Sequence, residues 1–255
     1  MNTTIQIQGV SKSFETDEGP LVAFGPADLD IKQGEFVSLL GPSGCGKSTL
    51  LMMLAGLEEP SSGKIFLNQT PVQSPRNDIG VMFQESTLVP WRTVLGNIEL
   101  QLELRGKRPE NFREQIDSLL NSVSMKGMEK RMPHELSGGM QQRAALCQAL
   151  IHQPQTLLLD EPLGKLDAMT RENIRGDLQR LWLDKKPTVV MVTHSIEEAV
   201  QMSTRVYLIS PRPGKIDKVV DIEMDYPRNL AVKQNPRFIQ YLADIHSVFH
   251  GYGVL

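Results

Sequence analysis

Residues 41–48 read Gly-Pro-Ser-Gly-Cys-Gly-Lys-Ser and directly follow the mainly apolar run 36–40. This is the G-x-x-x-x-G-K-[ST] pattern, which cradles phosphate groups where it joins a strand to a helix. Glycine lets backbone N–H groups approach phosphate oxygens, and the N-terminus of a helix beginning near Lys47 favours an anion. We expect Lys47 to reach the β- and γ-phosphates and the Ser48 hydroxyl to bind Mg²⁺. The nucleotide-binding residues predicted in this segment are Gly41, Pro42, Ser43, Gly44, Cys45, Gly46, Lys47, Ser48 and Thr49.

Two adjacent carboxylates follow a second apolar run, Leu157-Leu158-Leu159-Asp160-Glu161-Pro162. Ligands of open α/β sheets bind where parallel strands end, so these acids are expected at the nucleotide. Asp160 suits a Mg²⁺ partner, and Glu161 suits a base that activates the attacking water. Without the phosphate loop, both could equally be solvated loop acids.

The segment Leu-Ser-Gly-Gly-Met-Gln-Gln-Arg at residues 136–143 is a second glycine-rich helix entrance. Ser137 is a good N-cap for a helix running to about Gln153, before Pro154. A cap of this kind can be purely structural, but a helix N-terminus also offers a second place for an anion.

The composition is that of an ordinary globular protein, with 255 residues, 40% apolar and 22% charged. The net charge of −3, from 27 basic and 30 acidic residues, gives no electrostatic case for nucleic-acid binding. No apolar run is long enough for a transmembrane helix, and the polar N-terminus lacks the plan of a signal peptide. Cys45 and Cys147 stand in the phosphate loop and in an expected helix, so we expect no disulfide framework and a reducing cytosol. Work at a membrane would then require a partner.

The pattern of apolar residues and turns predicts an α/β protein with a helical insertion. Beyond the strand before the phosphate loop, we expect strands at 4–10 and 64–67, a further apolar run at 79–84, and central strands at 156–159 and 188–192. We expect helices at 48–57 and 168–183, a charged helical region at 91–153, and a helix opened by the capping box of Ser195 and Glu198. The last forty or so residues predict a loop-rich tail ending in a helix at about 236–249.

Taken in order, these motifs resemble those of ABC-transporter ATPase subunits, and the similarity covers nearly the whole chain. The matching elements are the phosphate loop, Gln84, the Leu-Ser-Gly-Gly segment, Leu-Leu-Leu-Asp-Glu-Pro, Leu166-Asp167 and Thr193-His194. Leu-Ser-Gly-Gly-x-Gln is the most specific of them, because other phosphate-loop families lack it. The resemblance implies a RecA-like P-loop NTPase core with an antiparallel β-subdomain and an inserted α-helical subdomain. We expect the core and β-subdomain at 1–90 and 154–210, the helical subdomain at 91–153 and a tail at 211–255.

The resemblance also implies a role for individual residues. Phe14 would stack on adenine, although it could be an ordinary aromatic at a strand end. Gln84 would contact Mg²⁺ or the attacking water, and His194 the γ-phosphate. Ser137, Gly138 and Gly139 would close over the γ-phosphate bound by an opposite subunit, and Asp167 would cross that dimer interface.

Residues 88–98, 210–216 and 235–238 resemble the nitrate/sulfonate/taurine branch of importers. In that reading, the groove of residues 84–97 receives a permease coupling helix, with Trp91 as a contact; alternatively, Trp91 belongs to the core. One departure from the family is Gly164-Lys165, where Ser-Ala or Gly-Ala is common before Leu-Asp.

The sequence therefore predicts the ATPase subunit of a bacterial importer, working as a head-to-tail dimer around two MgATP. It would bind permease subunits at the cytoplasmic face of the inner or plasma membrane, act indirectly with an external solute-binding protein, and bind no nucleic acid. One alternative is a soluble ABC ATPase acting on DNA or ribosomes, which the lack of long coiled coils or tandem cassettes disfavours. Another is a phosphate-loop kinase or GTPase, which the Leu-Ser-Gly-Gly segment opposes. The solute itself is not encoded here, since specificity resides in the permease and the binding protein.

Overall fold

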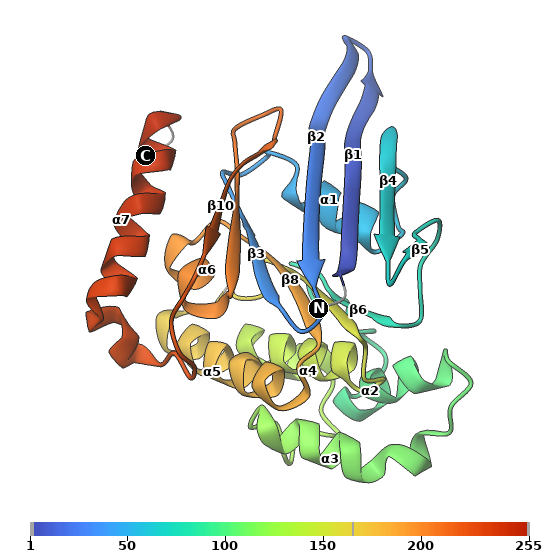
Figure 1. The fold of residues 1–255 in the computed structure, drawn as a ribbon. Coiled ribbons are helices and arrows are strands. Elements are labelled where there is room, and N and C mark those ends of the chain that lie inside the picture. The colour runs from blue at the N-terminus through green and yellow to red at the C-terminus, as the bar shows by residue number, and fades with distance from the viewer. Residues whose placement is uncertain (1–2, 165, 254–255) are drawn as a thin grey trace. The chain divides into compact units, whose positions relative to one another are not determined.

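The computed structural model describes residues 3–164 and 166–253. The chain divides into two compact units, one formed by Met1–Arg76 with Pro187–Leu255 and the other by Asn77–Lys186 (Figure 1). The subdomain boundaries given above stay a prediction. No helix in the described ranges is both long enough and apolar enough to cross a membrane.

The first unit contains an antiparallel sheet with the strand order β2-β1-β4-β5. Its strands are β1 (Thr3–Thr16), β2 (Gly19–Lys32), β4 (Ser62–Leu67) and β5 (Thr70–Pro71). Ile5 and Ile7 are buried while Gln8 is exposed, as the alternating pattern predicts. The strand extends beyond its predicted end at Val10 because β2 pairs with β1 along its whole length.

Parallel strands form the second sheet region of this unit. β3 (Phe36–Leu40) pairs in parallel with both β8 (Thr188–Thr193) and β9 (Arg205–Ile209). Every residue of β3 and β8 is buried, which agrees with their continuous apolar or β-branched sequences. The tail is less irregular than predicted, because β10 (Ile216–Asp221) adds an antiparallel edge strand to β9.

Helix α1 (Lys47–Leu54) is shorter than the predicted helix 48–57. Gly56 ends it with φ 71°, and its N–H donates to Met53 O at 3.1 Å while Leu57 N–H donates to Met52 O at 3.0 Å. A left-handed glycine after the last turn is a common helix stop. A Cβ at Gly56 would also lie 2.3 Å from Ser74 O, so the chain needs glycine at this turn.

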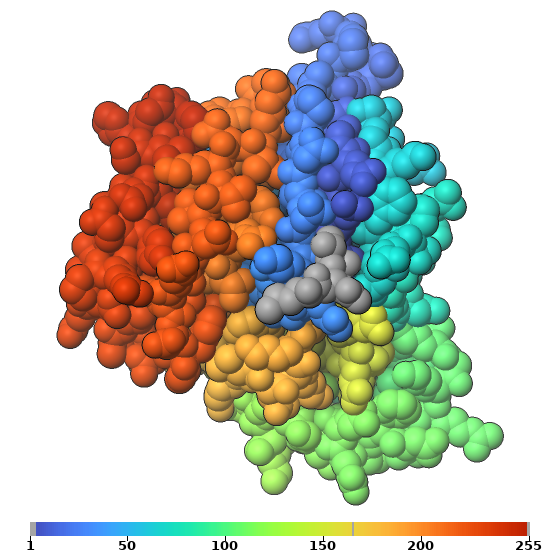
Figure 2. All heavy atoms as spheres, viewed as in Figure 1, coloured from blue at the N-terminus to red at the C-terminus, as the bar shows by residue number. Residues whose placement is uncertain are grey.

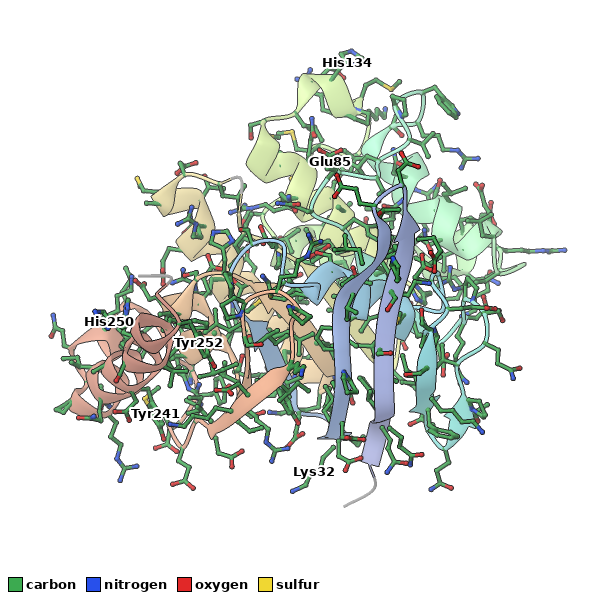
Figure 3. All side chains as sticks on the ribbon, turned by 90° about the horizontal axis from the view of Figure 1, so that it is seen from above. Lys32, Glu85, His134, Tyr241, His250 and Tyr252 are labelled. Carbon is green, nitrogen blue, oxygen red and sulfur yellow. The ribbon has the colours of Figure 1, made fainter. Side chains whose placement is uncertain are left out.

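The C-terminal segment packs on α6 (Ile196–Met202) through α7 (Pro236–Gly251) and a 3-10 helix at Leu230–Gln234. The buried guanidinium of Arg228 donates to the last carbonyl groups around α6, those of Val200 and Ser203. Tyr241 on α7 accepts a hydrogen bond from Glu223 N–H, and Tyr252, at the C-terminal end of this helix, bonds to Asp217 of β10 (Figure 3). The final helix was predicted correctly, with its end two residues later than expected.

The second unit contains one parallel strand pair and the helical region predicted at 91–153. The strands are β6 (Ile79–Met82) and β7 (Thr156–Asp160), and the helices are α2 (Val94–Glu103), α3 (Arg113–Ser122), α4 (Gly138–Leu150) and α5 (Ala168–Lys185). Short 3-10 turns stand at Pro109–Phe112 and Pro133–Glu135. All five residues of β7 are buried, so Asp160 ends a fully covered strand.

Candidate functional site

The phosphate loop, residues 41–48, connects β3 to the first turn of α1. Lys47 is 5% exposed, and its ammonium donates hydrogen bonds to the carbonyl oxygens of Gly41 (2.8 Å) and Pro42 (2.7 Å). The sulfur of Cys45 lies 3.8 Å from the same nitrogen. Burial raises the pKa of the Cys45 thiol, an effect that Lys47 opposes, so the thiol is neutral at pH 7. All three neighbours are therefore uncharged, so none of them forms an ion pair with Lys47.

The backbone of this loop is tightly packed on one side and open on the other. Gly46 has φ 95°, and a Cβ there would lie 2.4 Å from Ala23 O. Gly44 has φ 76° and is exposed, and a Cβ there would meet no atom within 4 Å. Helix α1 begins without a side-chain cap and without an acidic residue in its first turn. Uncapped N–H groups, a helix dipole and a buried lysine together fit a phosphate group.

His194 lies at the same strand edge as the phosphate loop. Leu40 and Thr193 are paired in the parallel register of β3 and β8, so Gly41 and His194 leave neighbouring strands side by side. Thr193 Oγ1 accepts a hydrogen bond from Ser195 N–H (3.0 Å) and donates one to Glu198 (2.8 Å). The backbone on both sides of His194 is thereby held in place.

Phe14 lies near the tip of the β1–β2 hairpin, which extends beyond β4 (Figures 1 and 2). It is directly opposite Leu21, and its side chain is 39% exposed. The Lys12 ammonium, which is paired with Glu58, lies 5.0 Å from the centre of the Phe14 ring. An aromatic ring left partly open in this way can stack on a base, so the adenine contact stays a prediction for Phe14.

In the second unit, Gln84 and Glu161 are joined by a direct hydrogen bond. Met82 of β6 is paired with Leu159 of β7, so the residues after both strands emerge at one edge. Gln84 Nε2 donates to Glu161 Oε2 at 3.0 Å, and the neighbouring Asp160 is 8% exposed. This edge offers amide and carboxylate oxygens of the kind that Mg²⁺ prefers.

Glu161 also has an unusual backbone. Its φ of 44° lies in the left-handed region that few non-glycine residues occupy, and its carbonyl oxygen accepts a hydrogen bond from Gly164 N–H (3.1 Å). Such backbone strain is concentrated at functional sites. In the described ranges, no three His, Cys, Asp or Glu side chains group as a metal site. The predicted Mg²⁺ ligands Ser48, Gln84 and Asp160 include only one carboxylate.

The signature segment opens helix α4 as predicted. Ser137 is the N-cap, and its Oγ accepts a hydrogen bond from Met140 N–H at 3.3 Å. Ser137 and Gly138 are exposed, whereas Gly139 packs on the start of α5. A Cβ at Gly139 would lie 2.4 Å from the methyl carbon of Thr170, so only glycine fits beneath that side chain.

Asp167 is exposed and serves as the N-cap of α5. One carboxylate oxygen accepts hydrogen bonds from Met169 N–H (3.1 Å) and Thr170 N–H (3.0 Å). Hydrogen bonding, led by the Thr170 side chain, lowers the pKa of Asp167, so this carboxylate is ionised at neutral pH. Arg171 donates to the carbonyl oxygens of Leu163 (3.3 Å) and Leu166 (2.8 Å), which secures the turn before Asp167. Lys165, the departure noted above, lies outside the described residues.

Trp91 is 77% exposed, so the alternative that it belongs to the core is wrong, and its contact with a permease stays a prediction. The turn that carries it is held by the fully buried Asn97. Asn97 accepts from Val89 N–H at 2.6 Å and donates to the carbonyl oxygens of Val89, Arg92 and Thr93. The turn held by Asn97 therefore presents a large aromatic side chain to solvent.

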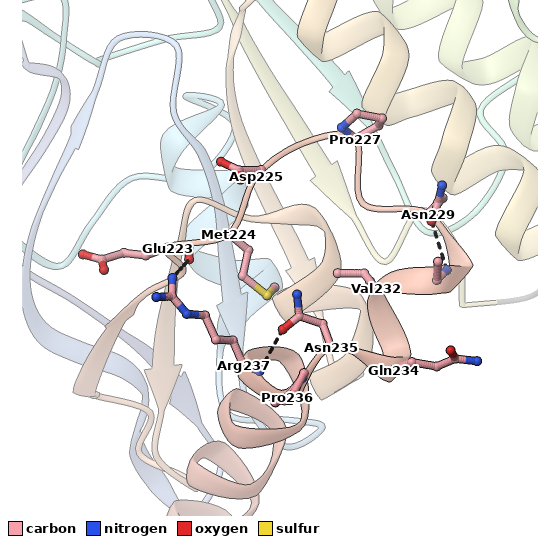
Figure 4. A pocket seen from close by; sticks show the side chains of 11 residues that line it. Glu223, Met224, Asp225, Pro227, Asn229, Val232, Gln234, Asn235, Pro236 and Arg237 are labelled. Carbon is pink, nitrogen blue, oxygen red and sulfur yellow. Dashed lines mark hydrogen bonds between the residues drawn. The ribbon is translucent and has the colours of Figure 1, made fainter.

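An open pocket of about 770 Å³ lies in the C-terminal segment (Figure 4). It is lined by Glu223, Met224, Asp225, Arg237 and neighbouring residues of 227–236, and Arg237 donates to Glu223 O at 3.3 Å. None of the residues predicted to bind nucleotide lines it. Its two carboxylates and single guanidinium do not specify a ligand.

The predicted site residues are divided between the two units. The phosphate loop, Phe14 and His194 belong to the first; Gln84, Asp160, Glu161, Ser137, Gly138, Gly139 and Asp167 belong to the second. Within the second unit, the Thr170 side chain lies against Gly139, and the Thr170 N–H donates to Asp167. Arg171 donates to the carbonyl oxygen of Leu166, just before Asp167. Sequence reasoning missed these two residues, and their positions three and four residues after the Asp167 cap were the available signal.

Comparison with known sequences identifies relatives along nearly the whole chain. The family described as ABC transporter matches residues 24–164. An uncharacterized ABC transporter ATP-binding protein of Methanocaldococcus jannaschii is 40% identical over 249 residues, which cover 97% of this chain and 92% of that protein. The aliphatic sulfonates import ATP-binding protein SsuB of Bacillus licheniformis is 44% identical over 226 residues, covering 89% of this chain and 88% of that protein.

Solved structures confirm the fold class. The dimeric ATP-binding cassette MJ0796, in a post-hydrolysis state bound to ADP and Pi, has a TM-score of 0.77 and 31% identity, covering 87% of this chain and 100% of that chain. The structure of cbiO1 from Clostridium perfringens, part of the ABC transporter complex cbiONQ, also has a TM-score of 0.77. It covers 98% of both chains at 23% identity and is similar in fold.

Proposed function

The chain belongs to the family of ABC transporter ATP-binding proteins and is an ATPase, and from this premise we propose that it energises a bacterial importer of a small solute. The aliphatic sulfonates import protein of Bacillus licheniformis supports an importer and a sulfonate-type solute. Separate permease subunits would carry the solute, and this chain would bind them at the cytoplasmic face of the membrane. A solute-binding protein would act on the opposite side. The exposed Trp91 supports a permease contact at its turn.

The phosphate loop is the proposed anchor for ATP. The Lys47 ammonium and the N–H groups at the start of α1 would hold the phosphate oxygens, and His194 would contact the γ-phosphate from the neighbouring strand end. Phe14 would stack on the adenine. Mg²⁺ held by Ser48, Gln84 and Asp160 would neutralise charge on the phosphate oxygens.

The hydrogen bond between Gln84 and Glu161 carries the proposed mechanism. Glu161 would accept a proton from the attacking water as general base, and Gln84 would orient the carboxylate for that transfer. The 3.0 Å distance between Gln84 Nε2 and Glu161 Oε2 supports this proposal, because one attacking water would contact both side chains. Since Gln84 lies at the start of the segment that carries Trp91, a permease contact could change the position of the amide and with it the rate of hydrolysis.

Two copies are proposed to act head to tail, each completing the other's nucleotide site. Ser137, Gly138 and Asp167 are exposed, which leaves them available to a second copy. The Ser137 hydroxyl and the N–H groups at the start of α4 would bind the γ-phosphate held by the partner's loop, adding donors where negative charge develops. The dimeric MJ0796 cassette supports this arrangement.

Substitution of Glu161 by Gln tests both the base and the dimer. The amide keeps the size of the side chain but accepts no proton, so we expect ATP turnover to fall by about 10²- to 10⁴-fold. We expect MgATP to convert the E161Q protein into a stable dimer, measured by size-exclusion chromatography with light scattering. Ser137→Ala in the same background should weaken that dimer. An E161Q chain that stays monomeric in saturating MgATP and keeps wild-type turnover would exclude Glu161 from this role.

The transport role is tested separately, because a soluble ABC ATPase would share the same chemistry. Co-purification of a permease, followed by reconstitution in proteoliposomes with its binding protein, should give ATPase activity that rises with the transported solute. Aliphatic sulfonates are the first solutes to assay. An ATPase that associates with no membrane protein and responds to nucleic acid or ribosomes would favour the soluble alternative.

A further inference from the structure

A short hairpin, residues 210–215, connects β9 to β10 and lies outside the residues with an assigned role. Two hydrogen bonds join its first and last residues. Ser210 N–H donates to Lys215 O (3.0 Å), and Ser210 Oγ accepts from Lys215 N–H (3.1 Å). Because the hydrogen bonds join its first and last residues, the position of Gly214 within it is well defined.

Gly214 packs directly on the backbone of the phosphate loop. A Cβ at Gly214 would lie 1.9 Å from the carbonyl oxygen of Cys45, far inside contact distance. Ile209, just before the hairpin, backs the start of the same loop, because a Cβ at Gly41 would lie 2.7 Å from Ile209 O. The loop is therefore supported at two points by the end of β9 and the hairpin.

The hairpin is itself tied to strand β2. Gly25 N–H donates to Gly214 O at 2.8 Å, and Phe24 forms a parallel bridge with Gly214. The same stretch of β2 contacts the loop, since a Cβ at Gly46 would lie 2.4 Å from Ala23 O. The loop is thus enclosed by two segments that are hydrogen-bonded to each other.

We propose that the 210–215 hairpin is a positioning element of the nucleotide site and that Gly214 is its positioning residue. By packing on Cys45 and bonding to Gly25, Gly214 holds the loop backbone in the curvature that its N–H groups need to surround phosphate. The proposal rests on the proposed role of the phosphate loop. Gly214 lies against the backbone of the loop, so the effect of the hairpin on nucleotide binding would pass through the position of the loop.

Gly214→Ala tests this directly, with Gly251→Ala as the matched control. Gly251 belongs to the same compact unit, and a Cβ there would meet no atom within 4 Å. Well below the unfolding temperature, we expect Gly214→Ala to raise KM for ATP by about ten- to a hundredfold, with kcat at saturating ATP changed by about twofold at most. Calorimetric titration with inorganic tripolyphosphate should show a parallel loss of affinity, because the substitution displaces the loop that is proposed to hold the phosphate groups.

Ser210→Ala keeps the proposal testable if Gly214→Ala does not fold. It removes the acceptor for Lys215 N–H without adding atoms, so we expect a smaller loss of tripolyphosphate affinity in the same direction. Folded variants whose KM and tripolyphosphate affinity equal those of Gly251→Ala would overturn the proposal. Lys47→Ala separates the two failures: if it retains wild-type tripolyphosphate binding, the loop assignment fails, and if it loses binding while the hairpin variants do not, only the hairpin proposal fails.

Discussion

Acidification is expected to destabilise the unit formed by residues 77–186 through one buried histidine. His152 is 8% exposed, and its Nε2 lies 3.2 Å from the carbonyl oxygen of Ile79. Burial, assisted by the positive charge of Arg105, lowers the pKa of His152 from 6.5 to about 4. Because the fold disfavours the protonated ring, the unfolded chain takes up the proton first as the pH falls. The contribution of His152 to stability is therefore complete above about pH 6.5 and is lost progressively toward pH 4.

The difference between the ordinary histidine pKa of 6.5 and the value of about 4 for His152 corresponds to about 3 kcal/mol of unfolding free energy, at about 1.4 kcal/mol for each pKa unit. Urea unfolding at about pH 7.5 and about pH 4.5 measures most of it, with His152→Gln as the reference protein. The glutamine amide can still donate to Ile79 but does not titrate. We expect the wild-type chain to lose about 2–3 kcal/mol more than the variant between these conditions. Equal losses in the two proteins would refute the reasoning.

Two further predictions concern residues of the second unit. Gly139→Ala would place a methyl group 2.4 Å from Thr170 Cγ2, and we expect kcat for ATP to fall by about tenfold or more as the start of α4 is displaced. Thr170→Ser removes the opposing methyl, so steady-state activity should recover in the double variant; a persistent loss would contradict the contact. Trp91→Ala should reduce retention of the permease in a detergent co-purification by about tenfold, since exposed tryptophan is a frequent anchor of interfaces. Retention equal to wild type would remove Trp91 from that surface.

The site residues that could be predicted from the sequence belong to short contiguous patterns. The phosphate loop is recognised from a strand followed by two glycines, a lysine and a serine at fixed spacing, and the Ser137 cap requires only a helix start. The contact of Gln84 with Glu161 was not predicted, because the role of Gln84 was implied only by the resemblance; the rule that parallel strands end at one edge of a sheet explains the contact. Met82 pairs with Leu159, and this register brings the residues that follow the two strands, Gln84 and Glu161, to the same edge of the sheet.

The parts that could not be predicted depend on pairings between distant residues. β10 has charged residues at Asp217, Lys218 and Asp221 and follows two prolines, so its sequence indicates a loop; pairing with β9 makes it an edge strand. Thr170 and Gly214 have no chemical signature of their own. Their importance depends on which residue packs against them, Gly139 in the case of Thr170 and Cys45 in the case of Gly214, and the sequence alone does not reveal these contacts.

The turn around His194 shows how a local pattern can predict an element correctly and still miss its bonds. Ser195 and Glu198 have the spacing of a capping box, and Ser195 Oγ does accept from Glu198 N–H, at 3.3 Å. The hydrogen bond of Ser195 N–H goes to Thr193 Oγ1, and that hydroxyl donates to Glu198. Thr193 is the last residue of β8, so one hydroxyl joins the strand end to the first turn of α6. The backbone of His194 is consequently tied to the end of β8, which is paired with the end of β3 just before the phosphate loop, and its contact with a γ-phosphate stays a prediction.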